Sequence, residues 1–167
     1  MSNSPSFEMD GVTRFTTGTV GPKGQRTFYI QVSDIDETVS LKLEKQQVLA
    51  LAEYLETMMT DLPAPQSAEL PVDLELAEPV ISEWVVASMG IAYSEAAERI
   101  VLWAEELVYD EVDDEQINPA TARFQVSVAQ AKAFIGRAMQ IVGDGRPPCP
   151  YCNTPLNDDA GWCPCVN

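Results

Sequence analysis

Four cysteines near the C-terminus are the residues whose type and spacing could do chemistry. The sequence reads Cys149-Pro-Tyr-Cys152, then ten residues, then Cys163-Pro-Cys165, and it contains no other cysteine. Zn²⁺ is held in structural sites by four tetrahedral ligands, among which thiolates are preferred. The pattern predicts a zinc site formed by Cys149, Cys152, Cys163 and Cys165. Because four thiolates close the coordination shell and leave no position for water, we expect a structural zinc.

The two halves of this cluster differ in how well they fit a zinc ribbon. Cys149-Pro-Tyr-Cys152, followed by Asn-Thr-Pro-Leu, resembles the first knuckle of a ribbon, where backbone N–H groups bond to sulfur. The second pair has one intervening residue where ribbons normally use two, which makes Cys165 the least secure ligand. Redox-switched chaperones also combine Cys-x-Cys with Cys-x-x-Cys in a C-terminal zinc centre. A thiol-based redox or metal sensor therefore stays open as an alternative.

Composition and charge narrow the classes of protein to which the chain can belong. The 167 residues are 46% hydrophobic, which is ample for a globular core. The net charge is −16, from 26 acidic and 10 basic residues, and histidine is absent. Without histidine the chain lacks the commonest general base and the usual catalytic triads. We predict no catalytic and no cofactor-binding residue. The acidic field disfavours nucleic acid and anionic membranes, and it favours another protein, with basic proteins as candidates.

The chain carries no mark of a membrane or secretory protein. No apolar run approaches the roughly 18 residues that a membrane helix needs, and no charged-then-apolar signal stretch opens the sequence. We expect a cytoplasmic protein without membrane contact. In that compartment thiols stay reduced, so clustered cysteines favour a metal over disulfides, and secretion with two disulfides is the alternative.

The periodicity of apolar residues predicts two units of three strands and one helix. Alternation predicts strands, and apolar residues at helical spacing predict helices. The first unit has expected strands at 12–20, 26–32 and 38–44 and a helix at 45–60. The second has expected strands at 82–93, 99–109 and 121–127 and a helix at 128–142.

A shift of 83 residues superimposes the ends of the two units. It places Thr38 on Thr121, and it carries the apolar strand residues Val39, Leu41 and Leu43 onto Ala122, Phe124 and Val126. All six apolar positions of the first helix remain apolar in the second. Any two strand–helix units would match in part, but here the strand, the change of period and the helix length agree under one shift. The pattern predicts an internal duplication.

The size of the units predicts how they are assembled. One unit of about 50 residues is too small to bury a stable core alone. We therefore expect an α+β fold of two pseudo-twofold-related β-β-β-α units packed together, followed by a small zinc knuckle. The expected organisation is a flexible tail at 1–10, the first unit at 11–62, a Pro-rich connector at 63–80, the second unit at 81–143 and the zinc knuckle at 144–167.

Two other stretches could hold ligands, and each has a plainer interpretation. The acidic run at 105–115 offers carboxylates to Ca²⁺ or Mg²⁺, but it lacks the spacing and central glycine of a calcium loop. A solvated strand end and loop is the favoured interpretation. Gly18, Gly21 and Gly24 surround Lys23 like a phosphate cradle, but strands flank them on both sides, so we expect a hairpin turn.

Repeats of strands followed by one helix also resemble single-strand nucleic-acid modules of the Pur-alpha kind. In such modules aromatic side chains on an open sheet face stack on bases. The candidates here are Phe15, Tyr29, Trp84 and Trp103. Because the sequence offers no basic groove, we interpret them as core or interface residues. Single-stranded nucleic-acid binding by a repeat-type module is kept as a second alternative.

Several motifs resemble those of an uncharacterised bacterial family, a domain of unknown function found largely in high-GC Gram-positive bacteria. The matching stretches, in chain order, are Gly18-Thr-Val-Gly21, Arg26-Thr-Phe-Tyr-Ile-Gln31, Leu43-Glu-Lys-Gln-Gln47 and Gly145-Arg-Pro-Pro-Cys-Pro-Tyr-Cys152 with Pro155-Leu156. The family typically ends in Gly-His-x-Cys-Pro-Arg-x-Asn-Gly. Cys163-Pro164 and Asn167 fit that tail, whereas the histidine is missing and Cys165 replaces the arginine. The resemblance implies no activity.

These observations together predict a non-catalytic, zinc-containing interaction or adaptor protein. The redox or metal sensor and the nucleic-acid module are the alternatives. The sequence predicts neither the oligomeric state nor the identity of a partner.

Overall fold

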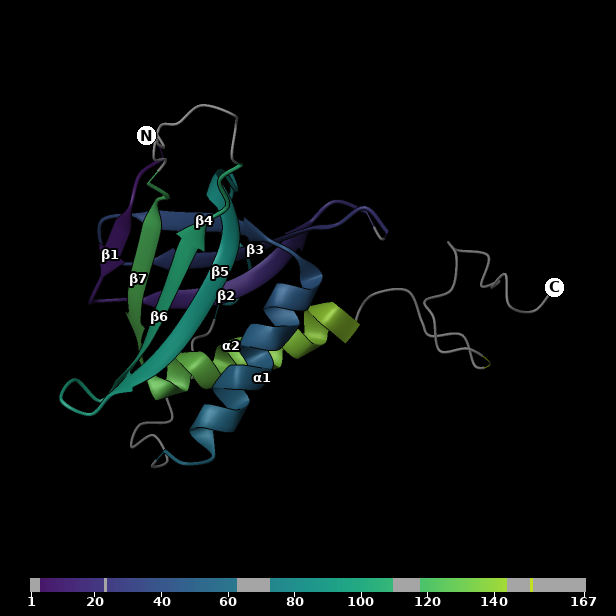
Figure 1. Ribbon diagram of the computed structural model, residues 1–167. Coiled ribbons are helices and arrows are strands. Elements are labelled where there is room, and N and C mark those ends of the chain that lie inside the picture. The colour runs from purple at the N-terminus through teal and green to yellow at the C-terminus, as the bar shows by residue number, and fades with distance from the viewer. Residues whose placement is uncertain (1–3, 23, 63–72, 110–117, 144–150, 152–167) are drawn as a thin grey trace.

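A bent mixed sheet with two helices forms the described part of the molecule (Figure 1). The computed structural model describes residues 4–22, 24–62, 73–109, 118–143 and 151. Within them, seven strands follow the order β1-β7-β6-β5-β4-β3-β2. The elements are β1 (Phe7–Met9), β2 (Arg14–Val20), β3 (Thr27–Ser33), β4 (Thr38–Leu43), α1 (Lys45–Met59), β5 (Ser82–Ser94), β6 (Arg99–Glu106), β7 (Thr121–Val126) and α2 (Val128–Gly143). The expected α+β class is confirmed, and the expected strands and helices are found within a few residues of their predicted bounds.

Two antiparallel meanders are joined by parallel pairs. β2, β3 and β4 form one meander, and β5, β6 and β7 form the other. The first residues of β5 pair in parallel with β4, with Ser40 opposite Ser82 and Lys42 opposite Val85. At the other end of the sheet, β1 pairs in parallel with β7. Each meander is therefore extended by a segment from the opposite half of the chain, β1 in one case and the first residues of β5 in the other.

The short strand β1 lies where the sequence led us to expect a flexible tail. Its Phe7 and Met9 lie opposite Ala122 and Phe124 of β7, and Met9 is only 1% exposed. A three-residue strand gives no measurable alternation, and its pairing partner is more than a hundred residues away in the chain. Local periodicity could not reveal this strand.

The long strand β5 bends and links the two meanders. It has 13 residues; its first residues pair with β4, and the rest pair with β6. The register shifts between Val86 and Ser88, as expected of a bulge that turns a strand from one sheet direction to another. In Figure 1, β2–β4 lie across the view, while β5 curves and lies upright in it beside β6 and β7.

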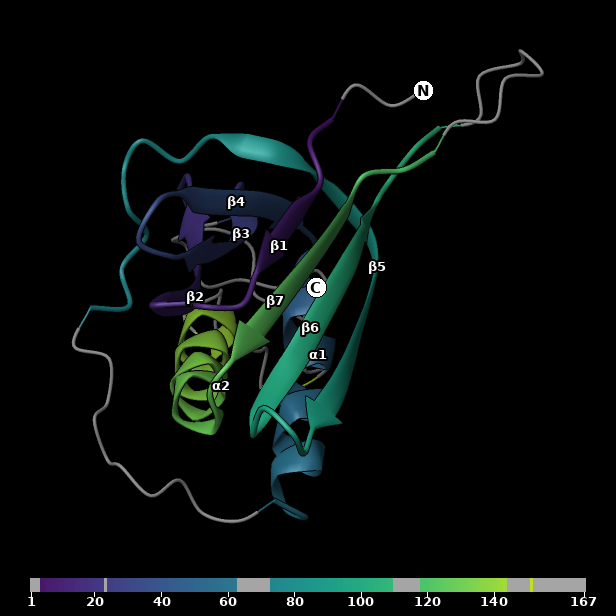
Figure 2. The same cartoon turned by 90° about the vertical axis from the view of Figure 1, so that its left-hand side faces the viewer.

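Both helices lie on the inner side of the bent sheet and touch each other (Figure 2). α1 buries Val48, Leu51, Ala52 and Leu55, and α2 buries Ala131, Phe134, Ala138 and Ile141, so the predicted apolar stripes face the core. The rings of Phe15 in β2 and Phe134 in α2 stack with centroids 4.3 Å apart. Of the helices in the described residues, neither is long and apolar enough to cross a membrane.

The described part of the connector covers the outer face of β2–β4. The hydroxyl of Thr16 donates to the carbonyl of Leu74 at 2.6 Å. Gln31, which is fully buried, accepts from the N–H of Ala77 at 2.7 Å and donates to the carbonyl of the same residue at 3.1 Å. The Leu76 side chain lies so close over Gly18 that a Cβ there would come within 2.5 Å of its Cγ. The first meander is thus covered on both faces.

Candidate functional site

The four cysteines predicted to bind zinc, Cys149, Cys152, Cys163 and Cys165, all lie outside the described residues. Tyr151, between the first two, is described and is 79% exposed. The zinc site and its knuckle stay predictions. Within the described part, no group of three or more Cys, Asp or Glu side chains is arranged to hold a metal ion.

The acidic run divides at the end of β6. Glu106 is buried, and its carboxylate accepts the N–H of Ala120 at 3.0 Å and the hydroxyl of Ser4. This carboxylate fastens the N-terminal segment to the start of β7. Residues 110–115 of the run lie outside the described residues, so the interpretation of that part as a solvated loop stays a prediction.

The glycine-rich stretch between β2 and β3 is a hairpin turn, as expected. Gly21 and Gly24 have φ values of 111° and 88°, which L-residues with side chains rarely adopt. The N–H of Gln25 donates to the carbonyl of Pro22 at 2.9 Å and closes the turn. The glycines therefore serve the backbone of the turn.

Of the four aromatic candidates for base stacking, two are core residues. Phe15 is stacked on α2, and the buried Trp84 donates from its indole N–H to the carbonyl of Pro5 at 2.9 Å. Trp103 is 45% exposed and lies on the outer face of β6 opposite Arg123. The guanidinium of Arg123 is paired with Glu8 at 3.3 Å and Asp10 at 3.2 Å. Acidic side chains therefore neutralise the cation beside Trp103, which disfavours a phosphate at this face.

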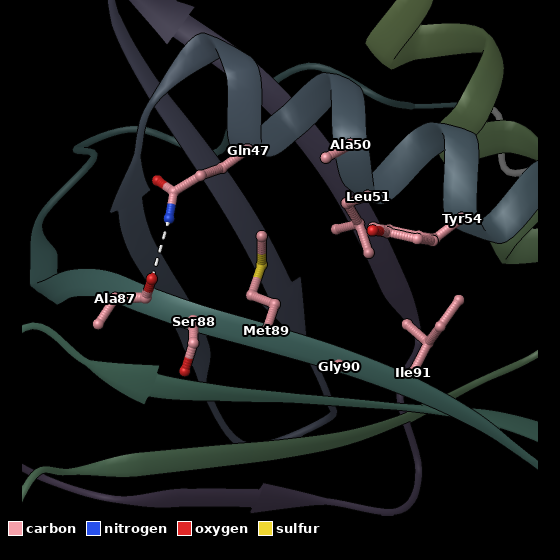
Figure 3. A pocket seen from close by; sticks show the side chains of 9 residues that line it. All are labelled: Gln47, Ala50, Leu51, Tyr54, Ala87, Ser88, Met89, Gly90 and Ile91. Atoms are coloured by element: carbon pink, nitrogen blue, oxygen red, sulfur yellow. Dashed lines mark hydrogen bonds between the residues drawn. The ribbon is translucent and has the colours of Figure 1, made fainter.

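A groove between α1 and β5 is the described feature best suited to binding, and the sequence analysis missed it. It has a cavity volume of about 490 Å³. Figure 3 shows Leu51 pointing from α1 toward β5, Tyr54 lying along the helix toward Leu51, and Met89 and Ile91 pointing from β5 toward the helix. Tyr54 is 68% exposed. The lining residues are Gln47, Ala50, Leu51, Tyr54, Ala87, Ser88, Met89, Gly90 and Ile91.

One end of the groove is closed by a glutamine at the start of α1. Gln47 Oε1 accepts the N–H of Glu44 at 2.8 Å, which completes a capping box at the helix N-terminus. Its Nε2 donates to the carbonyl of Val86 at 3.2 Å and to that of Ala87 at 3.5 Å, the second of which is drawn in Figure 3. This one side chain thus ties α1 to β5 at the point where β5 leaves β4.

Beyond that point, β5 has a partner strand on one side only. From Ser88 to Ser94 its backbone pairs with β6, and among the described residues no other backbone group bonds to this stretch. The opposite edge of β5 therefore faces the groove with unpaired N–H and C=O groups.

Sequence patterns carried little signal for this groove. Tyr54 looks like a residue at the border of an apolar stripe, and residues 86–92 of β5 lack the alternation of a half-buried strand. The space between α1 and β5 arises only because β5 separates from β4.

The described geometry defines a mixed α+β protein with an open helix–strand groove. The chain belongs to the family described as "Protein of unknown function (DUF3090)", whose family model matches residues 7–163. This confirms the resemblance to a domain-of-unknown-function family. No curated protein and no solved structure matches the chain. The match covers both meanders and both helices and ends at Cys163, so Cys165 lies beyond it.

Proposed function

We propose that the chain is a non-catalytic, zinc-containing interaction or adaptor protein. The groove between α1 and β5 is the observation that carries this proposal. Helices normally pack tightly onto the sheet they cover, and a place where apolar side chains stay without partners is a common sign of a binding surface. The net charge of −16 favours a basic protein as the partner.

We also propose that the two halves arose by duplication and are related by a pseudo-twofold axis. Two reciprocal features support this. β1 pairs with β7 of the second half, as the start of β5 pairs with β4 of the first half. Gln47 of α1 donates to the carbonyl of Val86, and Gln130 of α2 donates to that of Val12. Both glutamines also accept the N–H of the residue that caps their own helix. Position and role agree under the 83-residue shift.

The zinc knuckle forms the second part of the proposal. Four cysteines are a donor set that suits Zn²⁺, and zinc bound by four thiolates is structural. Zinc would supply folding energy to the short C-terminal segment that contains them. Cys149 and Cys152 are the firmer ligands, and Cys165 is the one whose role the family's tail pattern questions.

Affinity capture of the full chain from its native host, together with elemental analysis, tests the proposal. We expect one zinc per chain, retained after mild peroxide treatment, and a specific co-purifying protein. Cys149→Ser should abolish zinc retention, and the comparison of Cys165→Ser with wild type decides whether Cys165 is a ligand. Zinc loss on oxidation, coupled to a changed oligomeric state, would instead establish the redox sensor. Co-purifying nucleic acid that withstands high salt would support the second alternative.

A further inference from the structure

We propose that the groove between α1 and β5 binds an extended, basic peptide segment of a partner protein, which adds a strand to the free edge of β5. This inference rests on the proposed function as an interaction protein and names the chemistry of the partner. Three properties of the groove lead to it: a free backbone edge, an apolar wall on each side and an acidic surrounding.

The free edge of β5 favours the binding of a peptide with an extended backbone. Unpaired N–H and C=O groups along Ser88–Ser94 repeat with the spacing of a strand, about 3.3 Å per residue, so this stretch spans roughly 23 Å. A peptide in β conformation satisfies such a row of groups, and most small molecules do not. Gln47 already bonds to two carbonyls at the beginning of this edge and marks where the added strand would start.

The walls of the groove select apolar side chains at alternate positions of that peptide. Leu51 and Tyr54 of α1 line one side of the space, and Met89 and Ile91 of β5 line the other (Figure 3). The volume of about 490 Å³ accommodates a few side chains and is far too small for a folded domain. Since side chains of a strand alternate between faces, every second residue of the peptide would enter the groove and the others would face solvent.

The contact between α2 and β2 shows why the one between α1 and β5 is open. At α2 and β2, the stacked rings of Phe15 and Phe134 fill the interface, and Arg137 Nε donates to the carbonyl of Thr17 at 3.3 Å. Under the proposed duplication, Leu51 takes the place of Phe134, and Tyr54 takes the place of Arg137. Neither reaches β5 with a hydrogen bond among the described residues. The smaller side chain of Leu51 and the hydrogen bond that Tyr54 does not make leave the space that a peptide fills.

The negative charge of the protein favours basic residues in the peptide. Glu95 and Glu98 are exposed in the hairpin that follows β5, where its free edge ends. With a chain net charge of −16, a Lys- or Arg-containing segment is favoured in encounter and an acidic one is repelled.

Selection from a phage-displayed library of random dodecapeptides against the full-length, zinc-loaded protein tests the proposal. We expect enriched peptides with apolar residues at alternate positions and Lys or Arg between them. Ala50→Trp, which fills the groove, should weaken their binding about tenfold or more. Ala96→Trp, in the exposed hairpin after β5, is the matched control and should bind like wild type. Circular dichroism and thermal melting of both variants check that they fold.

Modified peptides test the backbone contact independently of any variant. N-methylation of the amides that point toward β5 should weaken binding about tenfold, whereas methylation of the intervening amides should be tolerated. The proposal is overturned if no peptide is enriched, if the enriched peptides bind Ala50→Trp as well as wild type, or if methylation has no positional effect. It is equally overturned if the groove holds a second copy, seen as a dimer that Ala50→Trp dissociates, or if a synthetic peptide of residues 144–167 occupies it. A native partner captured equally by wild type and Ala50→Trp would leave the interaction function intact and exclude this groove.

Discussion

At the scale of single residues, two glutamines connect the halves of the molecule. Gln47 and Gln130 each bond to the backbone at the start of their own helix and to a backbone carbonyl of the other half. A buried carbonyl that loses its donor costs more free energy than an exposed one, because water cannot replace the lost bond. Because Val86 and Val12 are both buried, each of the two glutamines should contribute to stability.

Gln130→Ala should lower the free energy of unfolding by about 1–2 kcal/mol, because it removes a helix cap and the bond to the carbonyl of the buried Val12. Gln47→Ala should have a comparable effect, since it removes part of a capping box and the bond to the carbonyl of Val86, which is 2% exposed. Urea unfolding measures both values. Gln140→Ala, on the exposed side of α2, is the control, and an equal effect of Gln130→Ala and Gln140→Ala would refute the bridging role.

Asp34 makes the contribution of the turn between β3 and β4 to stability depend on pH. Its Oδ1 accepts the N–H groups of Glu37 and Asp36, both at 2.8 Å, and these bonds lower the pKa of the carboxyl below its ordinary value of 3.8. A carboxyl whose pKa is lowered by folding stabilises the protein above its unfolded-state pKa. That contribution disappears as the pH falls through the folded-state pKa.

Asp34→Ala should therefore melt at a lower temperature than wild type near pH 6, and the difference should shrink below about pH 3.8. Asp34→Asn keeps an acceptor without the charge, so it should lie between the two and show a weaker dependence on pH. Thermal melts over a series of pH values provide the measurement. A difference between wild type and Asp34→Ala that stays constant from pH 6 to pH 2 would contradict this account.

At the scale of elements, a glycine in β5 makes room for a tryptophan in β6. A Cβ on Gly90 would lie 2.4 Å from the ring of Trp103, its cross-strand partner. Gly90→Ala should destabilise the protein by about 1–2 kcal/mol, because the indole must move from its place on the sheet. Urea unfolding measures the loss, and a red shift of tryptophan emission should accompany it.

The effect of Gly90→Ala on stability should change sign when Trp103 is absent. In a Trp103→Ala background, Gly90→Ala should be neutral or stabilising, since alanine then only removes freedom from the unfolded chain. Gly136→Ala in α2, where nothing lies within 4 Å of the added Cβ, should stabilise by about 0.5–1 kcal/mol. If Gly90→Ala costs the same with and without Trp103, steric contact with the ring is not the cause.

Which elements could be predicted from the sequence depended on how local their signals were. Alternation located β3 and β4, and helical spacing located α1 and α2, because those patterns are set by residues a few positions apart. The strand β1 and the groove depend on pairing between distant segments, which no window of local sequence contains. The cysteine pattern is also a local signal, but its residues lie outside the described part. The predicted zinc site is therefore tested by metal analysis.

At the scale of the whole molecule, neither half of the chain forms its part of the sheet alone. β1 from the first half extends the second meander, and the beginning of β5 extends the first. The helices contact each other, and α2 of the second half packs on β2 of the first. Because each half completes the core of the other, the halves should lose their structure together.

Core mutations in either half should therefore shift one common unfolding transition. Leu41 in β4 and Leu102 in β6 are both buried, and replacing either with alanine should cost about 2–5 kcal/mol. Trp84 and Trp103 lie in β5 and β6, so in a Trp162→Phe background the fluorescence reports on the second half, while circular dichroism reports on both helices. We expect the two signals to coincide for Leu41→Ala, although the mutation lies in the half without tryptophan. If Leu41→Ala moved the dichroism transition and left the fluorescence transition in place, the halves would fold independently, and the exchanged strands would be unimportant for stability.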